Sequence, residues 1–403
     1  MGARGGGAFM ELGAGRIVGM HRDRVRDAYG STVGRHRDEL TTPALVLDLA
    51  AAERNIARMA DRLGSLTAGI RPHYKAHKSP DLAMRQMAAG AVGMSAATVW
   101  EVAALVDAGI SDVFLVNEVA DPVKMAVLAA LARVATIRVA VDDAGNARLL
   151  SDAAVAAEAT FGVLVELDTG MGRCGVASPD AAVALARDVV ALPGLRFDGL
   201  TGYEGHCSLI ADAGERHREQ RAAMRSLVAA ADVLVGAGLP VSILSAGGTA
   251  TWEWTAADPR INEIQAGTYV LMDSEYARMS QGFEHSLFVQ ATVISRSSGR
   301  IVVDAGSKSV GDGMLATIVG ADAIPIRIDE EHGIFSDDSG AAHAVGDRVR
   351  LVPGYAPATV NLYDAYHVVV DDMVMDVWPV IPRGPGHDGL AAQVLGSGMA
   401  RDE

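Results

Sequence analysis

The strongest constraint on the fold is a regular alternation of short apolar runs with Ala-rich stretches of helical periodicity. One apolar run leads to Lys75, and seven more follow: Ala91–Ala96, Val113–Val116, Ile137–Val141, Phe161–Leu167, Phe197–Thr201, Val241–Leu244 and Ile264–Met272. Strands that alternate with helices form right-handed βαβ units around a parallel sheet. Eight such units predict a (β/α)₈ barrel. An open doubly wound sheet is the alternative, but no Gly-x-Gly-x-x-Gly follows the first strand.

The pattern changes near residue 280. Short β-type runs separated by Gly, Asp and Ser replace the helical stretches: Val289–Ile294, Arg300–Asp304, Asp347–Val352 and Ala365–Val370. We therefore expect an N-terminal arm over residues 1–39, a barrel over 40–279 and an all-β domain over 280–403. A helix is expected in the arm around Asp23–Tyr29, and the strand at 42–49 is a candidate to join the β-domain.

Composition excludes several classes of protein. The chain has 403 residues, a formal net charge of -15 and two cysteines. The negative charge argues against a nucleic-acid or anionic-membrane partner, and two cysteines make no disulfide framework. No membrane span and no secretory signal peptide is expected. A cytoplasmic location is the simplest prediction.

A cluster of titratable side chains closes the run that leads to Lys75. It comprises Arg71, His73, Lys75, His77 and Lys78. Burial at a barrel mouth and the like charges of Arg71 and Lys78 would lower the pKa of Lys75 and make its amine a nucleophile. The alternative interpretation is a solvated basic loop.

Three more groups follow predicted strand ends, where barrel chemistry takes place. Asp168-Thr-Gly-Met-Gly-Arg173 is a glycine-rich turn that can direct Arg173 inward, and Tyr203 and His206 follow another strand. Ser245-Ala-Gly-Gly-Thr249 precedes a predicted helix and could bind a phosphate. Each group also has a purely structural interpretation, as a surface arginine, a core tyrosine, a structural histidine or an ordinary turn.

The motifs RPHYKAHK, DTGMGRCG, GYEGH, SAGGT, EIQAGTYVLMD, DAGSKSVG and TVNL occur in this order. The chain resembles the D-threonine aldolase / D-serine dehydratase family, pyridoxal-phosphate (PLP) enzymes of the alanine-racemase-type fold, over roughly residues 40–385. The resemblance implies a PLP barrel, a C-terminal β-domain and a homodimer with active sites near the subunit interface. It implies a Schiff base on Lys75, Arg173 at the pyridine nitrogen, and a pocket that includes His73, Tyr203, His206, Gly248, Thr249 and Tyr276.

The chain departs from the family pattern before TVNL. A His-x-Cys or His-x-Asp metal-binding pair is expected there, but Tyr355 and Pro357 stand in its place, so a divalent metal is not expected. We therefore predict a metal-free lyase of aldolase type, with Tyr355 or His206 as base for the β-hydroxyl of an amino acid substrate. The alternatives are a racemase using Lys75 and Tyr355, a dehydratase and a non-catalytic PLP carrier. For Tyr355 itself, the alternative is a purely structural role in loop packing.

Overall fold

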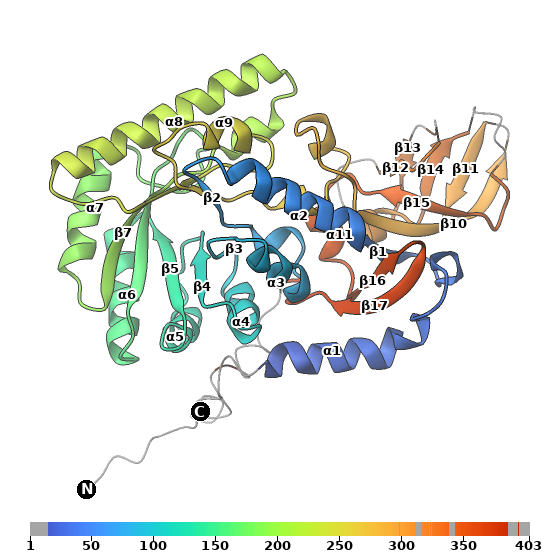
Figure 1. The fold of residues 1–403 in the computed structure, drawn as a ribbon, viewed down its shortest axis with the longest axis horizontal. Coiled ribbons are helices and arrows are strands. Elements are labelled where there is room, and N and C mark those ends of the chain that lie inside the picture. Colours follow the sequence, from blue (N-terminus) through green and yellow to red (C-terminus); the bar gives the residue numbers. More distant parts are fainter. Residues whose placement is uncertain are drawn as a thin grey trace, which may run out of the picture.

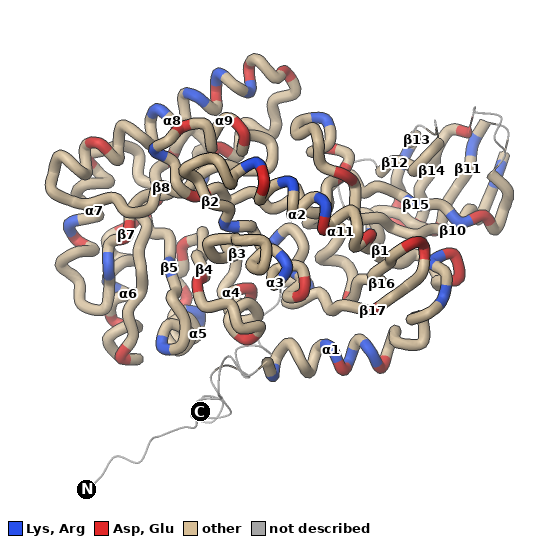
Figure 2. Tube along the Cα trace, in the orientation of Figure 1, with Lys and Arg blue, Asp and Glu red and all other residues tan. Residues whose placement is uncertain are grey.

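The computed structural model describes residues 15–297, 299–311, 316–321, 323, 325–337, 343–385 and 394. The predicted (β/α)₈ barrel with a C-terminal β-domain is confirmed (Figure 1). None of the helices in these residues is long and apolar enough to cross a membrane. Figure 2 shows Lys and Arg interspersed with Asp and Glu over both parts of the molecule.

Eight parallel strands form the barrel in the order β2-β9-β8-β7-β6-β5-β4-β3. They are β2 (Gly69–Ile70), β3 (Met94–Ala96), β4 (Asp112–Leu115), β5 (Thr136–Val141), β6 (Phe161–Glu166), β7 (Leu195–Thr201), β8 (Ile243–Ala246) and β9 (Glu263–Ile264). The sheet curls until β2 and β3, at its two ends, meet. There His73 forms a parallel bridge with Ser95, and the Ser95 N–H donates to Pro72 O at 2.9 Å.

Helices surround the barrel (Figure 1). They are α2 (Leu49–Leu63), α3 (Pro80–Ala88), α4 (Val99–Asp107), α5 (Pro122–Leu131), α6 (Ala144–Ala156), α7 (Pro179–Ala191), α8 (Ala213–Gly236) and α9 (Trp252–Ala256). Local sequence explains where most of them begin, because a side chain caps a free N–H of the first turn. Asp48 accepts the Ala51 N–H, and Ser79 and Ser178 cap helices whose first turn contains a proline.

The second sheet joins β1 (Ala44–Asp48) to strands from the C-terminal part of the chain. These are β10 (Leu287–Ser297), β11 (Arg300–Val303), β12 (Thr317–Ile318), β13 (Pro325–Ile328), β14 (Gly333–Ser336), β15 (Arg348–Val352), β16 (Ala365–Val370) and β17 (Met373–Pro379), with short helices α10 (Ser307–Val310) and α11 (Ala356–Val360). β1 pairs antiparallel with β10 and parallel with β16. The strand expected at 42–49 therefore hydrogen-bonds to this sheet, although the barrel helices follow it in the chain.

Helix α1 (Arg16–Tyr29) begins earlier than the helix expected around Asp23–Tyr29. It packs against α4 and β17, so it lies along both parts of the molecule (Figure 1). The Val18 N–H donates to Asp107 Oδ2 at 2.8 Å, and Arg22 forms an ion pair with Asp81. Of the expected N-terminal arm, residues 1–14 lie outside the described residues.

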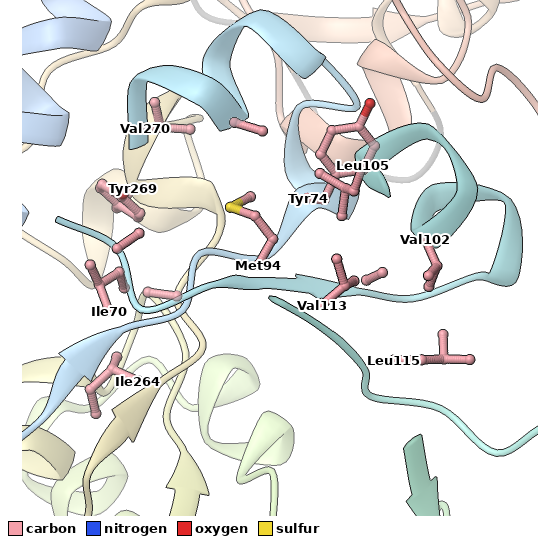
Figure 3. Close-up of a cluster of buried hydrophobic side chains, with 14 of the residues drawn as sticks. Ile70, Tyr74, Met94, Val102, Leu105, Val113, Leu115, Ile264, Tyr269 and Val270 are labelled. Atoms are coloured by element: carbon pink, nitrogen blue, oxygen red, sulfur yellow. The ribbon is translucent and has the colours of Figure 1, made fainter. Parts of the chain in front are cut away.

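The strand expected over Ile264–Met272 is wrong beyond Ile264. β9 ends there, and Thr268–Val270 forms a 3₁₀ turn that leaves the barrel rim. Tyr269 and Val270 are fully buried in the cluster that Figure 3 shows around Ile70, Tyr74 and Ile264. An apolar run that is buried on all sides looks the same in sequence whether it is a strand or a packed turn.

A network of charged side chains fills part of the barrel interior. Arg71 is 2 % exposed and donates two hydrogen bonds to Glu263, at 2.8 and 2.6 Å, and a third to Asp112 at 2.6 Å. Arg138 bridges Asp112 and Asp198. Glu263 and Asp112 begin β9 and β4, so the network lies towards the amino ends of the strands, away from the end where barrel active sites form.

Replacing Arg71 by methionine is therefore expected to destabilise the fold strongly. The variant leaves Glu263 without its bidentate partner in a buried position, which costs about 3–5 kcal/mol. Urea unfolding of the variant measures the loss. Arg62→Met is the control, because Arg62 is exposed and its ion pair with Glu253 is worth less than about 1 kcal/mol. Equal losses in the two variants would contradict the prediction.

Candidate active site

A cavity opens at the carboxyl ends of the barrel strands, against the α11 segment. Its free volume is about 860 Å³, including the open mouth. Eight of the predicted site residues line it: His73, Lys75, Arg173, Tyr203, Gly248, Thr249, Tyr276 and Tyr355. His206 lies in the adjoining hollow, which Lys75, Arg173, Tyr203, Tyr276 and Tyr355 also line. The fold thus brings all nine residues to one mouth.

Lys75 lies in a 3₁₀ turn, Tyr74–Ala76, directly above the barrel. Its Nζ is 5.7 Å from the centre of the Tyr203 ring. Burial lowers the pKa of the amine; the Glu101 carboxylate opposes this shift and the Arg173 guanidinium adds to it. A lowered pKa leaves more of the amine uncharged and nucleophilic.

The direction of this pKa shift agrees with the sequence, but the expected source of like charge was wrong. Arg71 points down into the barrel and is bound by Glu263 and Asp112. Lys78 turns towards the β-domain and contacts Asn361. The like charge near Lys75 comes instead from Arg173, which is distant in sequence.

The glycine-rich turn after β6 brings Arg173 to the cavity. Asp168 Oδ1 accepts the N–H groups of Gly170 and Gly172 at 2.9 and 3.1 Å. Gly175 has a positive φ of 105°, and a Cβ there would lie 2.4 Å from the Asp168 nitrogen, so the turn requires glycine. The Arg173 Cζ is 5.8 Å from the centre of the Tyr203 ring.

Three phenols converge on the cavity: Tyr203, Tyr276 and Tyr355. Asp273 connects two of them, because it accepts the Tyr276 N–H at 2.8 Å and the N–H of Ala356, the residue after Tyr355, at 2.9 Å. Burial raises the pKa of Tyr203 to about 12 and also raises the pKa of Tyr355. All three hydroxyls are therefore protonated near neutral pH, since burial raises the pKa of Tyr276 as well.

The Gly-Gly-Thr segment lies beside the phenols. A Cβ on Gly248 would lie 3.1 Å from the Tyr203 ring. The absence of a side chain at this position therefore leaves room for the ring. The Gly248 N–H contacts Thr251 Oγ1 at 3.2 Å, and Thr249 Oγ1 accepts the Tyr269 N–H at 3.1 Å. The helix that follows, α9, has only five residues. Its dipole is short, so an anion here would depend mainly on local donors.

The two histidines differ in their surroundings. His73 is buried, and burial lowers its pKa well below the ordinary value, so its ring is neutral. Its Nδ1 has no hydrogen-bond partner among the described residues. His206 is half-buried in the 3₁₀ helix Gly205–Leu209, its Nδ1 is also without a partner there, and its Nε2 lies 3.7 Å from Cys207 Sγ.

Residues that the sequence analysis did not single out also line the cavity, among them Asn117, Glu166, Gln265 and Thr268. Glu166 is 6 % exposed and lies 3.9 Å from Arg173. Gln265 Nε2 donates to Ser245 Oγ at 2.8 Å and to Thr201 Oγ1 at 3.1 Å. Glu166 ends β6, and Gln265 follows β9 within the motif EIQAGTYVLMD. Their position at strand ends was the signal in the sequence that could have identified them.

Glu166 predicts a measurable pH dependence of stability. Burial and the neighbouring Glu118 carboxyl raise its pKa from 4.5 to about 8. Between these values the folded chain holds a proton that the unfolded chain has lost, so this residue's contribution to stability falls as pH rises. The free energy of unfolding of the protein, minus that of Glu166→Gln, should decrease between about pH 5 and about pH 8. Glu330→Gln, an exposed control, should show no such trend; a flat difference for Glu166 would refute the assignment.

The two positions of the expected metal pair lie at the start of α11. Tyr355 precedes α11, and Pro357 lies in its first turn with no ligand atom in its side chain. Elsewhere on the barrel mouth, Glu118, Asp142 and Cys174 place possible ligand atoms within 4.8 Å of one another. Glu118 contacts Glu166, and Asp142 Oδ2 accepts the Gly175 N–H at 2.9 Å, while Glu118 Oε1 has no hydrogen-bond partner among the described residues.

The cavity residues fit PLP. Lys75 offers a nucleophilic amine for an aldehyde, and the Thr249 and Thr268 hydroxyls line the same wall as Gly248. Gly267 allows close packing, because a Cβ there would lie 2.9 Å from His73 O. The unpartnered buried Nδ1 of His73 and the guanidinium of Arg173 add polar groups of the kind that a polar aromatic ring can use.

Comparisons with known proteins agree with this architecture. The family model for the alanine racemase N-terminal domain matches residues 47–275, and one for a serine dehydratase domain matches residues 286–369. A D-threonine aldolase of an Arthrobacter species is 40% identical over 351 residues, covering 85% of this chain and 93% of the relative. The 3-hydroxy-D-aspartate aldolase of Paracoccus denitrificans (strain Pd 1222) is 37% identical over 368 residues, covering 88% and 95%.

Among solved structures, D-threonine aldolase from Filomicrobium marinum superposes with a TM-score of 0.85 at 37% identity. The match covers 88% of this chain and 99% of that chain. The likeness therefore includes both the barrel and the β-domain. The chain is an enzyme of the D-threonine aldolase / D-serine dehydratase family, and its barrel is an alanine racemase N-terminal domain.

Proposed function

We propose that this enzyme is a PLP-dependent lyase of aldolase type. It cleaves, or forms, the Cα–Cβ bond of a D-configured or α-substituted β-hydroxy-α-amino acid. The observation that carries the proposal is the convergence of Lys75, Arg173 and three phenols on one cavity, in a chain whose 37–40% identical relatives are named aldolases.

Lys75 would hold the cofactor through its amine, and Gly248, Thr249 and Thr268 would surround the phosphate. Arg173 would face the ring nitrogen; a guanidinium stays charged, so it would donate a hydrogen bond without giving up its proton. PLP, when bound, supplies an electron sink for the electron pair of the broken Cα–Cβ bond.

The protein's own task is then to remove the proton of the β-hydroxyl. The raised pKa of Tyr355 makes its phenolate scarce at neutral pH, so we assign Tyr355 to orient the hydroxyl by hydrogen bonding. His206, in the adjoining hollow, is assigned to accept the proton. The same shift weighs against the racemase alternative, in which Tyr355 would have to act as a base.

We further propose that no tightly bound metal takes part, because Tyr355 and Pro357 occupy the place of the expected ligands. Activity is expected to persist in EDTA, and elemental analysis of the purified enzyme should find no stoichiometric zinc or manganese. Activity that EDTA removes and a single metal restores would refute this. Glu118→Gln would then test whether the cluster with Asp142 and Cys174 holds that metal.

The deciding experiment is incubation of the PLP-loaded enzyme with D-threonine and with D-phenylserine. Formation of acetaldehyde or benzaldehyde with an equal amount of glycine would support the lyase. Inversion of a simple amino acid without aldehyde would favour the racemase, and ammonia with a keto acid would favour the dehydratase. A homodimer is also proposed from the family resemblance, and sedimentation equilibrium would test it.

A further inference from the structure

The segment that carries Lys75, residues 74–78, is attached to the C-terminal part of the chain at several points. The Tyr74 hydroxyl donates to Ile381 O at 2.6 Å, and the Ile381 N–H donates to Lys78 O at 2.8 Å. The Tyr366 hydroxyl donates to His77 O. The position of the nucleophile is therefore set from two directions, by the barrel below and by the β-domain beside it.

Lys78 makes a further contact from this segment, and it does so with its side chain. Its φ of 46° is in the left-handed region, which is uncommon for residues other than glycine and is found at functional sites. Its Nζ donates to Asn361 Oδ1 at 2.8 Å and lies 3.8 Å from Glu101 Oε1. Glu101 is 1 % exposed and accepts the Ala97 N–H at 2.7 Å. Lys78 thus places a positive charge beside a buried carboxylate, on which the Lys75 amine also acts.

Asn361 connects this charge to the segment that carries Tyr355, another residue lining the cavity. It directly follows α11, and Tyr355 directly precedes the same short helix. The other end of α11 is fixed by Asp273, which accepts the Ala356 N–H and the Tyr276 N–H. The Lys78 side chain therefore connects the segment of Lys75 to the helix that begins next to Tyr355, and this helix also packs against the turn Tyr74–Ala76.

We propose that Lys78 is a positioning residue. Through its contacts with Glu101 and Asn361, it fixes the position of Lys75 relative to Tyr355 in the cavity. The inference rests on the proposed function. An apolar side chain of similar length would fill the same space without the cost of burying charge, so packing alone does not explain a lysine here. The ammonium can bind Asn361 and neutralise Glu101 at once, which an apolar side chain cannot do.

The test compares Lys78→Met, Lys78→Arg and the double variant Lys78→Met with Glu101→Gln, all loaded with PLP. Misplacement of reacting groups by about 1 Å can cost up to about 100-fold in rate. We expect kcat for D-phenylserine cleavage to fall about 10-fold or more in Lys78→Met, with KM and cofactor content nearly unchanged. Lys78→Arg should recover most of kcat. Lys124→Met, on the exposed start of α5, is the matched control and should behave as the parent enzyme.

The double variant, compared with Glu101→Gln alone, separates positioning from stability, because Glu101 also acts on the pKa of Lys75. It removes the uncompensated carboxylate, so its unfolding midpoint should return towards that of the parent while kcat stays low. If Lys78→Met alone does not fold, the double variant is used to test the proposal in its place. A kcat that recovers together with stability, or a Lys78→Met enzyme within about twofold of the parent, would overturn the proposal.

A second readout keeps this inference separate from the proposed function. D-Alanine has no β-hydroxyl to lose, but its amine would compete with that of Lys75 for the cofactor, and a change in the visible spectrum would report this. The rate constant of that change, measured by stopped flow, should fall in Lys78→Met by a factor similar to kcat. If the parent enzyme releases no aldehyde, the aldolase assignment fails and the D-alanine rate alone decides the role of Lys78: a slowed rate supports it and an unchanged rate refutes it.

Discussion

Lys75→Ala is expected to abolish turnover of β-hydroxy-α-amino acids, with a loss of at least about 10³-fold. Nothing else among the described lining residues offers an amine: the cavity wall contains histidine, arginine, tyrosine and threonine side chains, but one lysine. Because burial lowers the pKa of this amine, a larger fraction of it is uncharged and able to attack an aldehyde.

The measurement has two parts, aldehyde release and the visible spectrum of the PLP-loaded protein. The parent should absorb near about 420 nm, and Lys75→Ala should lose this band while keeping its unfolding midpoint. Lys124→Ala is the matched control, because that lysine is exposed on α5. Turnover by Lys75→Ala at more than a few per cent of the parent rate would remove Lys75 from the mechanism and the present proposal with it.

His206→Asn is expected to lower kcat for aldehyde release by about 10²–10⁴-fold, the range of a general base. Asparagine keeps a polar side chain of similar size but cannot accept and release a proton. Tyr355→Phe should cost less, about 10-fold, because it removes one hydrogen bond to the β-hydroxyl and no proton acceptor. This order follows from the raised pKa of Tyr355, which keeps its phenol protonated at neutral pH.

Both variants should still bind PLP, so their spectra without substrate should match the parent spectrum. A larger loss in Tyr355→Phe than in His206→Asn would reverse the assignment and make Tyr355 the base. Tyr203→Phe is a useful comparison, since its phenol lines the same cavity and its pKa is raised to about 12. Its loss should resemble that of Tyr355→Phe, not that of His206→Asn.

The barrel was predictable from sequence because its signal is local. Short buried runs alternate with helical stretches that begin at capping residues such as Asp48, Ser79 and Ser178. Each unit of that pattern is contained in a short stretch of chain, and strands joined in this way can pair only in a few topologies. The error at Ile264–Met272 arose because a run of apolar residues indicates burial but does not distinguish a strand from a packed turn.

The candidate site was predictable in its members more than in its electrostatics. Strand ends meet at one rim of a barrel, so Lys75, Arg173, Tyr203 and Gly248 had to come together once the fold was right. Which charges act on which group depends on where long side chains point. Arg71 is four residues from Lys75 yet points into the barrel towards Glu263, 192 residues away in sequence.

The sequence by itself determined the order of the βα units, the lysine at the first strand end, and the presence of Tyr355 and Pro357 where the family resemblance implies a metal-binding pair. The tertiary structure decided that Glu166 shares a buried site with Glu118, and that Lys78 reaches Asn361, 283 residues along the chain. The physical reason is that hydrophobic periodicity and capping act within a few turns of chain. Burial and charge pairing depend on neighbours that only the folded chain brings together.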